Sequence, residues 1–281
     1  MKLLRFGPEG EEKPGLLDAD GHLRDLSGVA ADFGGDGVAL PALDALRALA
    51  PASLPIVESP GRIGACLSYV PNFFAVGLNY KEHAAELSAP PPEEPILFSK
   101  SASSLSGPYD ALTLPRSSEK ADWEVELGIV IGRTAHYVSE EDAPGYVAGY
   151  CIVNDVSERA FQLEHGGQWS KGKSAPGFGP VGPWLVTPDE IEDVQNLALS
   201  TRLNDDVMQS SSTSDMIFPV AQIISYMSQF MELRPGDLIA TGTPPGIGMG
   251  KMPQRFLRAG DVLDLEIAGL GAQRTEILPS A

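Results

Sequence analysis

The chain has 281 residues, of which 43% are hydrophobic and 21% are charged, and this composition is typical of a globular protein. Its 20 Lys and Arg residues against 38 Asp and Glu residues give a net charge of -18. That balance excludes nucleic-acid binding, because phosphate contacts need a basic surface. The length favours one dominant domain with a small appendage.

Neither a signal peptide nor a membrane span is expected. The first residues become charged too soon to supply the apolar region of a signal peptide, and no apolar run is long enough to cross a bilayer. The two cysteines, Cys66 and Cys151, lie in apolar stretches without metal-ligand spacing, so we expect buried free thiols. We therefore predict a cytoplasmic protein that does not contact membranes.

Residues 1–70 are expected to form a small N-terminal accessory domain. Lys2–Phe6 has the composition of a strand, and Pro14–Leu26 is typical of a hairpin that turns at Asp20-Gly21. Pro41–Ala50 has helical spacing, and the proline-rich segment Pro51–Pro60 indicates a linker. We expect the chemistry in residues 71–281.

From residue 74 onward, short segments rich in Val, Ile and Leu alternate with loops rich in Gly and Pro. We expect strands at Phe74–Leu78, Pro95–Phe98, Trp123–Ile131, Tyr146–Val153, Trp184–Val186, Asp237–Thr241 and Asp261–Ile267. Helical spacing occurs at Phe218–Phe230, with shorter candidates at Tyr80–Leu87 and Ser157–Glu164. The 30 Gly and 24 Pro fit many turns better than a regular β–α–β alternation. The sequence therefore predicts an α+β protein that is rich in β-structure.

Two glutamates lie on one face of the predicted strand Trp123–Ile131. Side chains alternate along a strand, so Glu124 and Glu126 share the face opposite Val125 and Leu127. Two like charges repel each other unless something neutralises them, and hard divalent cations take oxygen ligands. The alternative is a solvated face without a ligand, and a lone Glu-x-Glu pattern favours that alternative.

Asp155 adds a third carboxylate at the end of the apolar segment Tyr150–Asn154. A carboxylate at a strand end is well placed to project into a cleft, although Asp155 could instead cap the helix expected after it. Together the three carboxylates on two neighbouring strands form a candidate metal site with open positions for water and substrate. No His or Cys set with zinc spacing competes with it.

His83 is the histidine with the best context for catalysis. The other three, His22, His136 and His165, lie in predicted turns or polar loops. His83 follows a predicted strand and stands three residues before Glu86 on a short helix, so the two side chains share a face. A carboxylate beside an imidazole orients it and raises its basicity. The alternative is a solvated surface pair.

The glycine-rich segment Thr241–Lys251 is not a nucleotide-binding loop. A P-loop needs Gly where Pro245 stands and Ser or Thr where Met252 stands. What remains is a strand that opens into a tight loop, which can offer Thr hydroxyls and backbone N–H groups to an anion.

Taken together, these segments resemble the fumarylacetoacetate hydrolase family. Within it they are most similar to the bacterial acylpyruvate hydrolases, diketo-deoxy-sugar-acid hydrolases and hydroxyheptadienedioate isomerases. The resemblance runs from about Phe74 to Leu278. Its motifs are Gly77-Leu78-Asn79-Tyr80 with His83 and Glu86, Phe98-Ser99-Lys100, Trp123-Glu124-Val125-Glu126-Leu127, Asn154-Asp155-Val156-Ser157 with Arg159 and Gln162, Lys171-Gly172-Lys173-Ser174, Gly179-Pro180-Val181-Gly182-Pro183, Pro235-Gly236-Asp237-Leu238-Ile239 and Thr241–Gly248.

The resemblance implies a fold, a cofactor and a set of site residues. The fold would be a mixed β-sheet roll or sandwich with a small N-terminal domain, and the protein would be a homodimer. The metal would be Mg²⁺ or Mn²⁺, with Ca²⁺ able to replace it in crystals, and its ligands would be Glu124, Glu126 and Asp155. The implied catalytic residues are His83 and Glu86 on a lid helix, with Lys173. The implied substrate contacts are Arg159, Gln162, Thr243, Lys100 and Tyr80.

The implied reaction is hydrolytic cleavage of a C–C bond in a small 2,4-diketo acid. A keto–enol isomerase acting on a 2-hydroxy-diene-dioate and an oxaloacetate decarboxylase could use the same site. A catalytically inactive metal-binding member is a third alternative, and the presence of both His83 and Glu86 argues against it.

The chain departs from the family pattern at one place. Many relatives read Lys-Ser-x-Asp-Thr-Phe where this chain reads Lys173-Ser174-Ala175-Pro176-Gly177-Phe178. The change removes two polar side chains near the expected pocket wall. It leaves the metal and base positions intact, so it puts the identity of the substrate in doubt rather than the chemistry.

Overall fold

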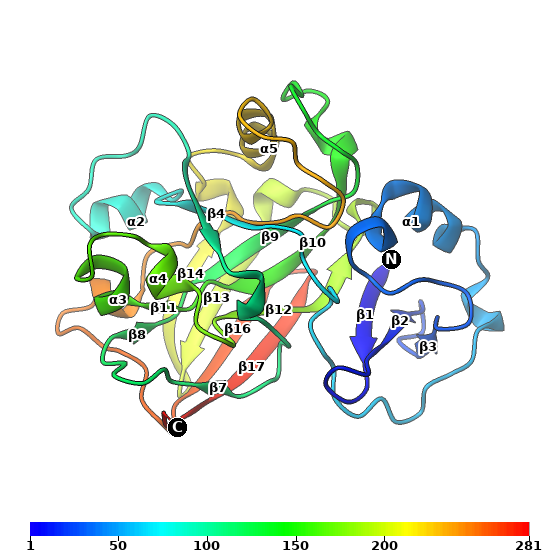
Figure 1. Cartoon of the computed structure of the whole chain (residues 1–281), viewed down its shortest axis with the longest axis horizontal. Coiled ribbons are helices and arrows are strands. Elements are labelled where there is room, and N and C mark those ends of the chain that lie inside the picture. The colour runs from blue at the N-terminus through cyan, green and yellow to red at the C-terminus, as the bar shows by residue number, and fades with distance from the viewer. Residues whose placement is uncertain (281) are drawn as a thin grey trace.

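The computed structural model describes residues 1–280 and consists mainly of two β-sheets packed face to face (Figure 1). The larger is a mixed sheet of ten strands. Its spatial order is β3 (Leu23–Asp25), β2 (Lys13–Leu17), β1 (Lys2–Phe6), β12 (Gly179–Val186), β10 (Val147–Asn154), β9 (Val125–Ile131), β15 (Leu238–Ala240), β4 (Phe73–Gly77) and β5 (Ile96–Lys100), with β6 (Leu105–Ser106) beside β12. Only the β15–β4 and β12–β6 pairs are parallel among the described strands of this sheet.

The second sheet has five strands. Its order is β14 (Asp206–Ser212), β13 (Ala198–Leu203), β16 (Val262–Ile267), β17 (Gly271–Leu278) and β7 (Leu112–Thr113). A two-stranded ribbon of β8 (Ala121–Asp122) and β11 (Ser157–Glu158) lies next to the start of β9.

The helices are short. They are α1 (Leu40–Arg47), α2 (Lys81–Glu86), α3 (Arg159–Leu163), α4 (Ser170–Lys173) and α5 (Val220–Ser228). Figure 1 shows α2, α3 and α4 gathered at one end of the molecule, while the N-terminal unit with α1 lies at the other end. None of the helices within residues 1–280 is long and apolar enough to cross a membrane.

Both faces of β9 are buried, and each faces a different part of the core. Val125, Leu127 and Ile129 belong to the main cluster, in which they meet apolar side chains of β13, β16 and α5. Val130 points to the opposite face and joins a second cluster with Leu3 of the N-terminal unit. The alternation expected from the sequence therefore places Glu126 of β9 on the face away from the main core.

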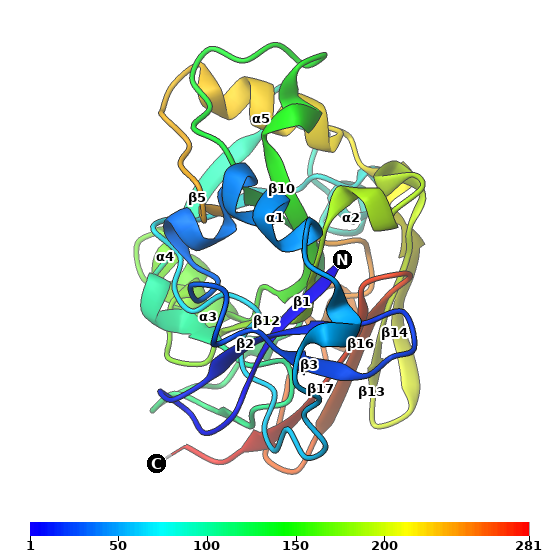
Figure 2. The same ribbon diagram turned by 90° about the vertical axis from the view of Figure 1, so that its right-hand side faces the viewer.

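The N-terminal unit continues the large sheet instead of standing apart from it. Strand β1 pairs with β12, with Leu3 opposite Leu185. Figure 2, in which the right-hand side of Figure 1 faces the viewer, shows β1–β3 and α1 together. Residues 51–60, expected to be a linker, run beside β3, where the Val57 N–H donates to Leu23 O at 2.9 Å. Cys66 and Cys151 are buried free thiols, as expected.

The predicted α+β, β-rich class is confirmed, and the expected strands and helices are present with shifted ends. Strands β13, β14 and β17 were not expected from the sequence. On β17 the inward positions include the buried polar residues Gln273 and Thr275, so the apolar alternation that marks a strand is absent. Residues 157–158 pair with β8 as a strand, and the helix there begins at Arg159.

The division at residue 70 stays a prediction, and the shared core suggests how to test it. Leu43 of α1 is fully buried in the second cluster, so we expect Leu43→Ala to lower the free energy of unfolding of the whole chain by about 2–5 kcal/mol. Denaturant unfolding followed by both far-UV circular dichroism and tryptophan fluorescence should give one coincident transition. A separate early transition, with the remainder unaffected, would contradict a shared core.

Candidate active site

Three buried carboxylates come together where β9 begins and β10 ends. Asn154 and Val125 face each other in this antiparallel pair, which brings Glu124 next to Asp155, and the Asp155 N–H donates to Glu124 O at 2.9 Å. One carboxylate oxygen from each of Glu124, Glu126 and Asp155 lies within 4.8 Å of the others. All three residues are at most 5% exposed, so the solvated-face alternative is excluded.

Asp155 does not cap the helix that follows it. Glu158 takes that role, because its side chain accepts a hydrogen bond from the Ala160 N–H at the start of α3. Asp155 instead accepts from two lysines, Lys100 at Oδ1 and Lys173 at Oδ2, each at 2.6 Å.

Positive charge is distributed unevenly over the three carboxylates. Glu124 accepts from Arg159 Nη2 at 2.7 Å and also bonds the ammonium group of Lys173. Glu126 has no cationic partner among the described residues, and its carboxylate accepts a hydrogen bond from the Gly242 N–H at 2.8 Å.

The pKa values follow this distribution. Burial alone would raise the pKa of Glu124, but the charges of Arg159 and Lys173 outweigh it and hold that pKa below its usual value. Burial raises the pKa of Glu126 well above normal, and repulsion from Asp155 and Glu124 raises it further. A hard divalent cation is the partner that would ionise Glu126, and an all-oxygen donor set is what such a cation prefers. The residues present therefore fit a divalent metal.

Asp122 is a member of this cluster that the sequence did not single out. It is fully buried and accepts from Arg159 Nε at 2.9 Å, from Gly248 N at 2.6 Å and from Met249 N at 3.0 Å. It thereby orients the guanidinium group that binds Glu124. Its position two residues before Glu124 was the available signal, because alternate residues of an extended chain share a face.

The glycine-rich loop after β15 offers its N–H groups to the protein's own carboxylates. Gly242 donates to Glu126, and Gly246 donates to Glu86 Oε1 at 2.9 Å. Both glycines have left-handed backbone conformations, with φ of 97° and 107°. A Cβ at Gly246 would lie 2.0 Å from Met208 O, so no larger residue fits. The anion-binding loop expected from the sequence is present, and its anions are internal.

His83 and Glu86 form a pair in which the histidine is buried and the glutamate is half-buried. His83 is 4% exposed, and its Nδ1 lies 3.1 Å from Glu86 Oε2, while the other oxygen of Glu86 is held by Gly246. The alternative of a solvated surface pair is therefore excluded. Because Glu86 selects the tautomer with hydrogen on Nδ1, the lone pair on Nε2 is left to act as a base.

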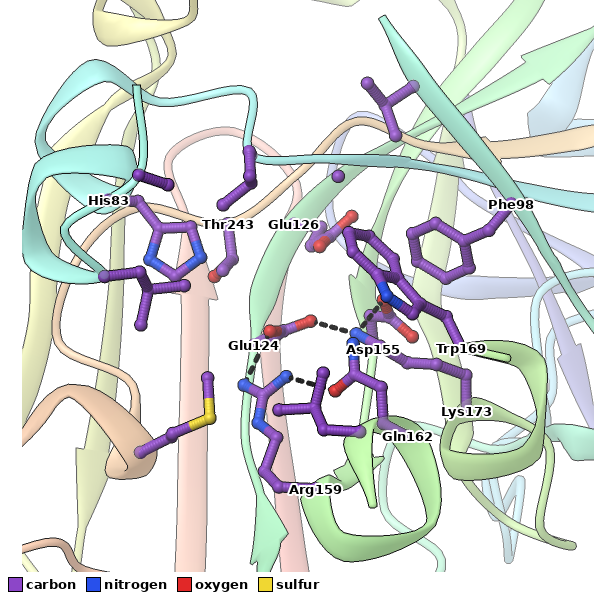
Figure 3. A pocket seen from close by; sticks show the side chains of 17 residues that line it. His83, Phe98, Glu124, Glu126, Asp155, Arg159, Gln162, Trp169, Lys173 and Thr243 are labelled. Carbon is purple, nitrogen blue, oxygen red and sulfur yellow. Dashed lines mark hydrogen bonds and ion pairs between the residues drawn. The ribbon is translucent and has the colours of Figure 1, made fainter. Parts of the chain in front are cut away.

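These side chains surround one cavity of about 120 Å³, shown in Figure 3. The predicted site residues that line it are His83, Glu124, Glu126, Asp155, Arg159, Gln162, Lys173 and Thr243. Three predicted site residues, Glu86, Lys100 and Tyr80, are not part of its wall. Glu86 acts on His83, Lys100 bonds Asp155 and the Lys173 carbonyl, and Tyr80 is 1% exposed within the main core.

The apolar part of the wall was not foreseen. It consists of Val76, Leu78, Leu87, Ala89, Phe98, Leu163, Trp169 and Met249, with Gly77. Apolar residues in loops and at helix ends carry no chemical signature of their own, so only the folded chain could bring them together.

Pro176 and Gly177, the residues at which this chain differs from the family pattern, lie outside the cavity wall. Both residues line a different hollow, which they share with Arg62 and Asp110 near the N-terminal unit. The expectation that this departure alters the pocket wall is therefore wrong, and the substrate must be inferred from the residues that do line the cavity.

A cavity that joins a cluster of buried carboxylates to a histidine held by a carboxylate, built on a β-rich fold, is typical of a small-molecule enzyme. Residues 72–278 match the fumarylacetoacetate (FAA) hydrolase C-terminal family model. A protein of Burkholderia lata, provisionally named a hydrolase, is 54% identical over 274 residues, which are 97% of each chain. The chain belongs to the fumarylacetoacetate hydrolase family.

Two solved structures extend the comparison. A fumarylacetoacetate hydrolase from Exiguobacterium antarcticum has a TM-score of 0.87 with 34% identity and covers 99% of each chain. A 2-hydroxyhepta-2,4-diene-1,7-dioate isomerase from Mycobacterium marinum has a TM-score of 0.75 with 30% identity, over 99% of this chain and 98% of that one. Relatives with this fold thus carry the names of two reaction types.

Glu124 has two cationic partners and Glu126 has none, so the same substitution should have opposite effects on stability at the two positions. In the presence of a chelator, Glu126→Gln should raise the free energy of unfolding at neutral pH by about 1 kcal/mol or more, because it removes a buried carboxylate without a cationic partner. Glu124→Gln should lower it by about 3–5 kcal/mol, because Arg159 and Lys173 lose their shared partner. Thermal stabilisation by an added divalent cation should be smaller for both variants than for the parent protein.

The effect of Glu126→Gln should also depend on pH. The folded-state pKa of Glu126 is raised, so between its unfolded value of about 4.3 and the raised folded value the folded protein binds more protons. Metal-free parent protein should therefore lose stability relative to the variant as the pH rises through this window. Urea unfolding of both proteins across that window, with a chelator present, measures the difference. A constant difference would contradict a raised pKa at Glu126.

Proposed function

We propose that this chain is a metal-dependent hydrolase that cleaves a C–C bond in a small 2,4-diketo acid of the acylpyruvate type, giving pyruvate and a carboxylic acid. The observation that carries the proposal is that His83, held by Glu86, lines the same cavity as the carboxylate cluster. Hydrolysis needs a group that activates water, whereas tautomerisation and decarboxylation do not. The hydrolase name of the Burkholderia relative also supports it.

The metal would be Mg²⁺ or Mn²⁺, held by Glu124, Glu126 and Asp155. Three carboxylates whose oxygens converge and which offer no nitrogen or sulfur ligand suit these hard cations. When bound, such a cation supplies Lewis acidity to the oxygens of the keto acid and stabilises the charge of the departing enolate.

The chain's own cations bind and orient the acid. Lys173 and Arg159 line the cavity at the carboxylate cluster and supply a positive potential for the substrate carboxylate. Asp122 and Gln162 hold the guanidinium group of Arg159 on its remaining sides, which keeps the site organised before substrate arrives.

His83 carries the proton transfer. Its Nε2 takes a proton from water while Glu86 holds Nδ1 and stabilises the imidazolium that forms. The resulting hydroxide adds to the carbonyl carbon at position 4, and the bond between carbons 3 and 4 breaks. The proton then returns to carbon 3, so diketo acid and water together give pyruvate and a carboxylic acid.

A keto–enol isomerase or an oxaloacetate decarboxylase is the second candidate function. The observation in its favour is the isomerase name of the Mycobacterium marinum structure, which is similar over 99% of this chain. Decarboxylation separates from hydrolysis at His83, because it does not require water to be deprotonated. Isomerisation also moves a proton, so it is distinguished from hydrolysis by the absence of pyruvate release.

The test is a substrate panel on metal-loaded protein: several acylpyruvates, a diketo-deoxy sugar acid and oxaloacetate. We expect loss of the diketo absorbance with stoichiometric release of pyruvate. His83→Ala should lower kcat for hydrolysis by about 100-fold to 10,000-fold, while any decarboxylation is spared. Glu86→Gln should lower it less.

His136→Ala is the matched control, because His136 is an exposed histidine outside the cavity wall and its loss should leave kcat unchanged. Hydrolysis that persists in His83→Ala, or that survives both chelation and Glu124→Gln, would contradict the proposed mechanism. The homodimer also stays a proposal, and light scattering on the purified protein tests it.

A further inference from the structure

The positively charged side chains of the cavity wall already form ion pairs with carboxylates of the protein. Among the described lining residues, the only Lys and Arg side chains are Arg159 and Lys173. Arg159 binds Asp122 and Glu124, and Lys173 binds Glu124 and Asp155. Both cations lie at the carboxylate cluster, where they can meet the head group of a keto acid. The rest of the wall contains no Lys or Arg for a second carboxylate on the substrate.

An aromatic pair forms one side of the wall. The rings of Phe98 and Trp169 meet edge to face, with centroids 5.3 Å apart, and Figure 3 shows them together beside the carboxylates. A Cβ at Gly77 would lie 2.5 Å from the Trp169 ring, so that ring packs directly on the backbone of β4. Lys173 Nζ lies 5.2 Å from the centre of the Phe98 ring, which joins the aromatic pair to the charged part of the site.

Leu163 is the exposed member of the cavity wall. This residue ends α3 and is 47% exposed, whereas every other described residue of the wall is buried or half-buried. A substrate tail that runs from the carboxylates to Leu163 therefore lies along apolar side chains.

We propose that the substrate is a monocarboxylic keto acid whose acyl tail is short, apolar and uncharged, and that this tail lies inside the cavity against the apolar wall, with its end at Leu163. This inference rests on the proposed function for the identity of the head group. A tail carboxylate would lose water without gaining a cationic partner, and a polyhydroxylated tail would lose hydrogen bonds against the apolar wall. An apolar tail gains from burial at the same place. A cavity of about 120 Å³ also limits the size of the tail.

The test compares two six-carbon probes, 2-oxohexanoate and 2-oxoadipate, which share the keto-acid head and differ in the end of the tail. Their binding to metal-loaded full-length protein is measured by calorimetry. High ionic strength prevents the net charge of -18 from rejecting a dianion by itself. We expect 2-oxohexanoate to bind about 30-fold more tightly or better. Equal affinities, or tighter binding of 2-oxoadipate, would overturn the inference.

Leu163→Arg tests where the tail lies. An arginine at this position would provide a partner for the distal carboxylate, so the preference for 2-oxohexanoate should fall by about tenfold or more. Val207→Arg is the matched control, because it adds the same charge at a position 55% exposed on β14, outside the cavity wall. A preference that Leu163→Arg leaves at the parent value would overturn the placement of the tail.

The outcomes also separate the inference from the proposed function. Hydrolysis of an acylpyruvate combined with equal binding of the two probes overturns only the tail inference. The expected binding preference without release of pyruvate from any acylpyruvate overturns only the proposed hydrolysis. Failure of both probes to bind metal-loaded protein, together with no release of pyruvate from any acylpyruvate, overturns both.

Discussion

The ammonium group of Lys173 bonds Glu124 and Asp155 at the same time, and much of the structure around the cavity depends on this contact. Glu124 precedes β9, Asp155 follows β10 and Lys173 ends α4, so one cation ties together three segments. Lys100 of β5 adds a fourth, because it bonds both Asp155 and the Lys173 carbonyl. The buried charges of this network are tolerated because each has a partner of opposite sign. Glu126 is the exception, and its partner would be a metal.

Backbone geometry complements this charge network. The loop after β15 supplies N–H groups to Glu126, Glu86 and Asp122, one carboxylate from each functional part of the site. The carboxylates that would hold the metal, orient the histidine and orient Arg159 are thus positioned by the same short segment. Two of its glycines, Gly242 and Gly246, adopt conformations that other residues rarely reach, so the path of the loop requires glycine at these positions. Such fixed dipoles keep a site organised before substrate binds.

The fold was predictable from the sequence where local pattern and final burial agree. Strand β9 shows this agreement, because its apolar residues alternate with the glutamates and both sets lie on the expected faces. Prediction failed where the inward positions are polar, as on β17, whose buried Gln273 donates to backbone carbonyls of β10 and β12. The sequence also did not indicate that the N-terminal unit adds strands to the large sheet, because the β1–β12 pairing joins residues far apart in the chain.

The sequence by itself determined the residue types of the site: two glutamates with period two, an aspartate at a strand end, and a histidine three residues before a glutamate. Short-range spacing suffices for these, since it fixes which side chains share a face. Tertiary structure alone decided their burial, the pairing of Glu124 but not Glu126 with cations, and the place of Asp122. It also moved Pro176-Gly177 away from the cavity and built an apolar wall from five separate segments. Those features depend on contacts between residues far apart in the chain, which no local pattern records.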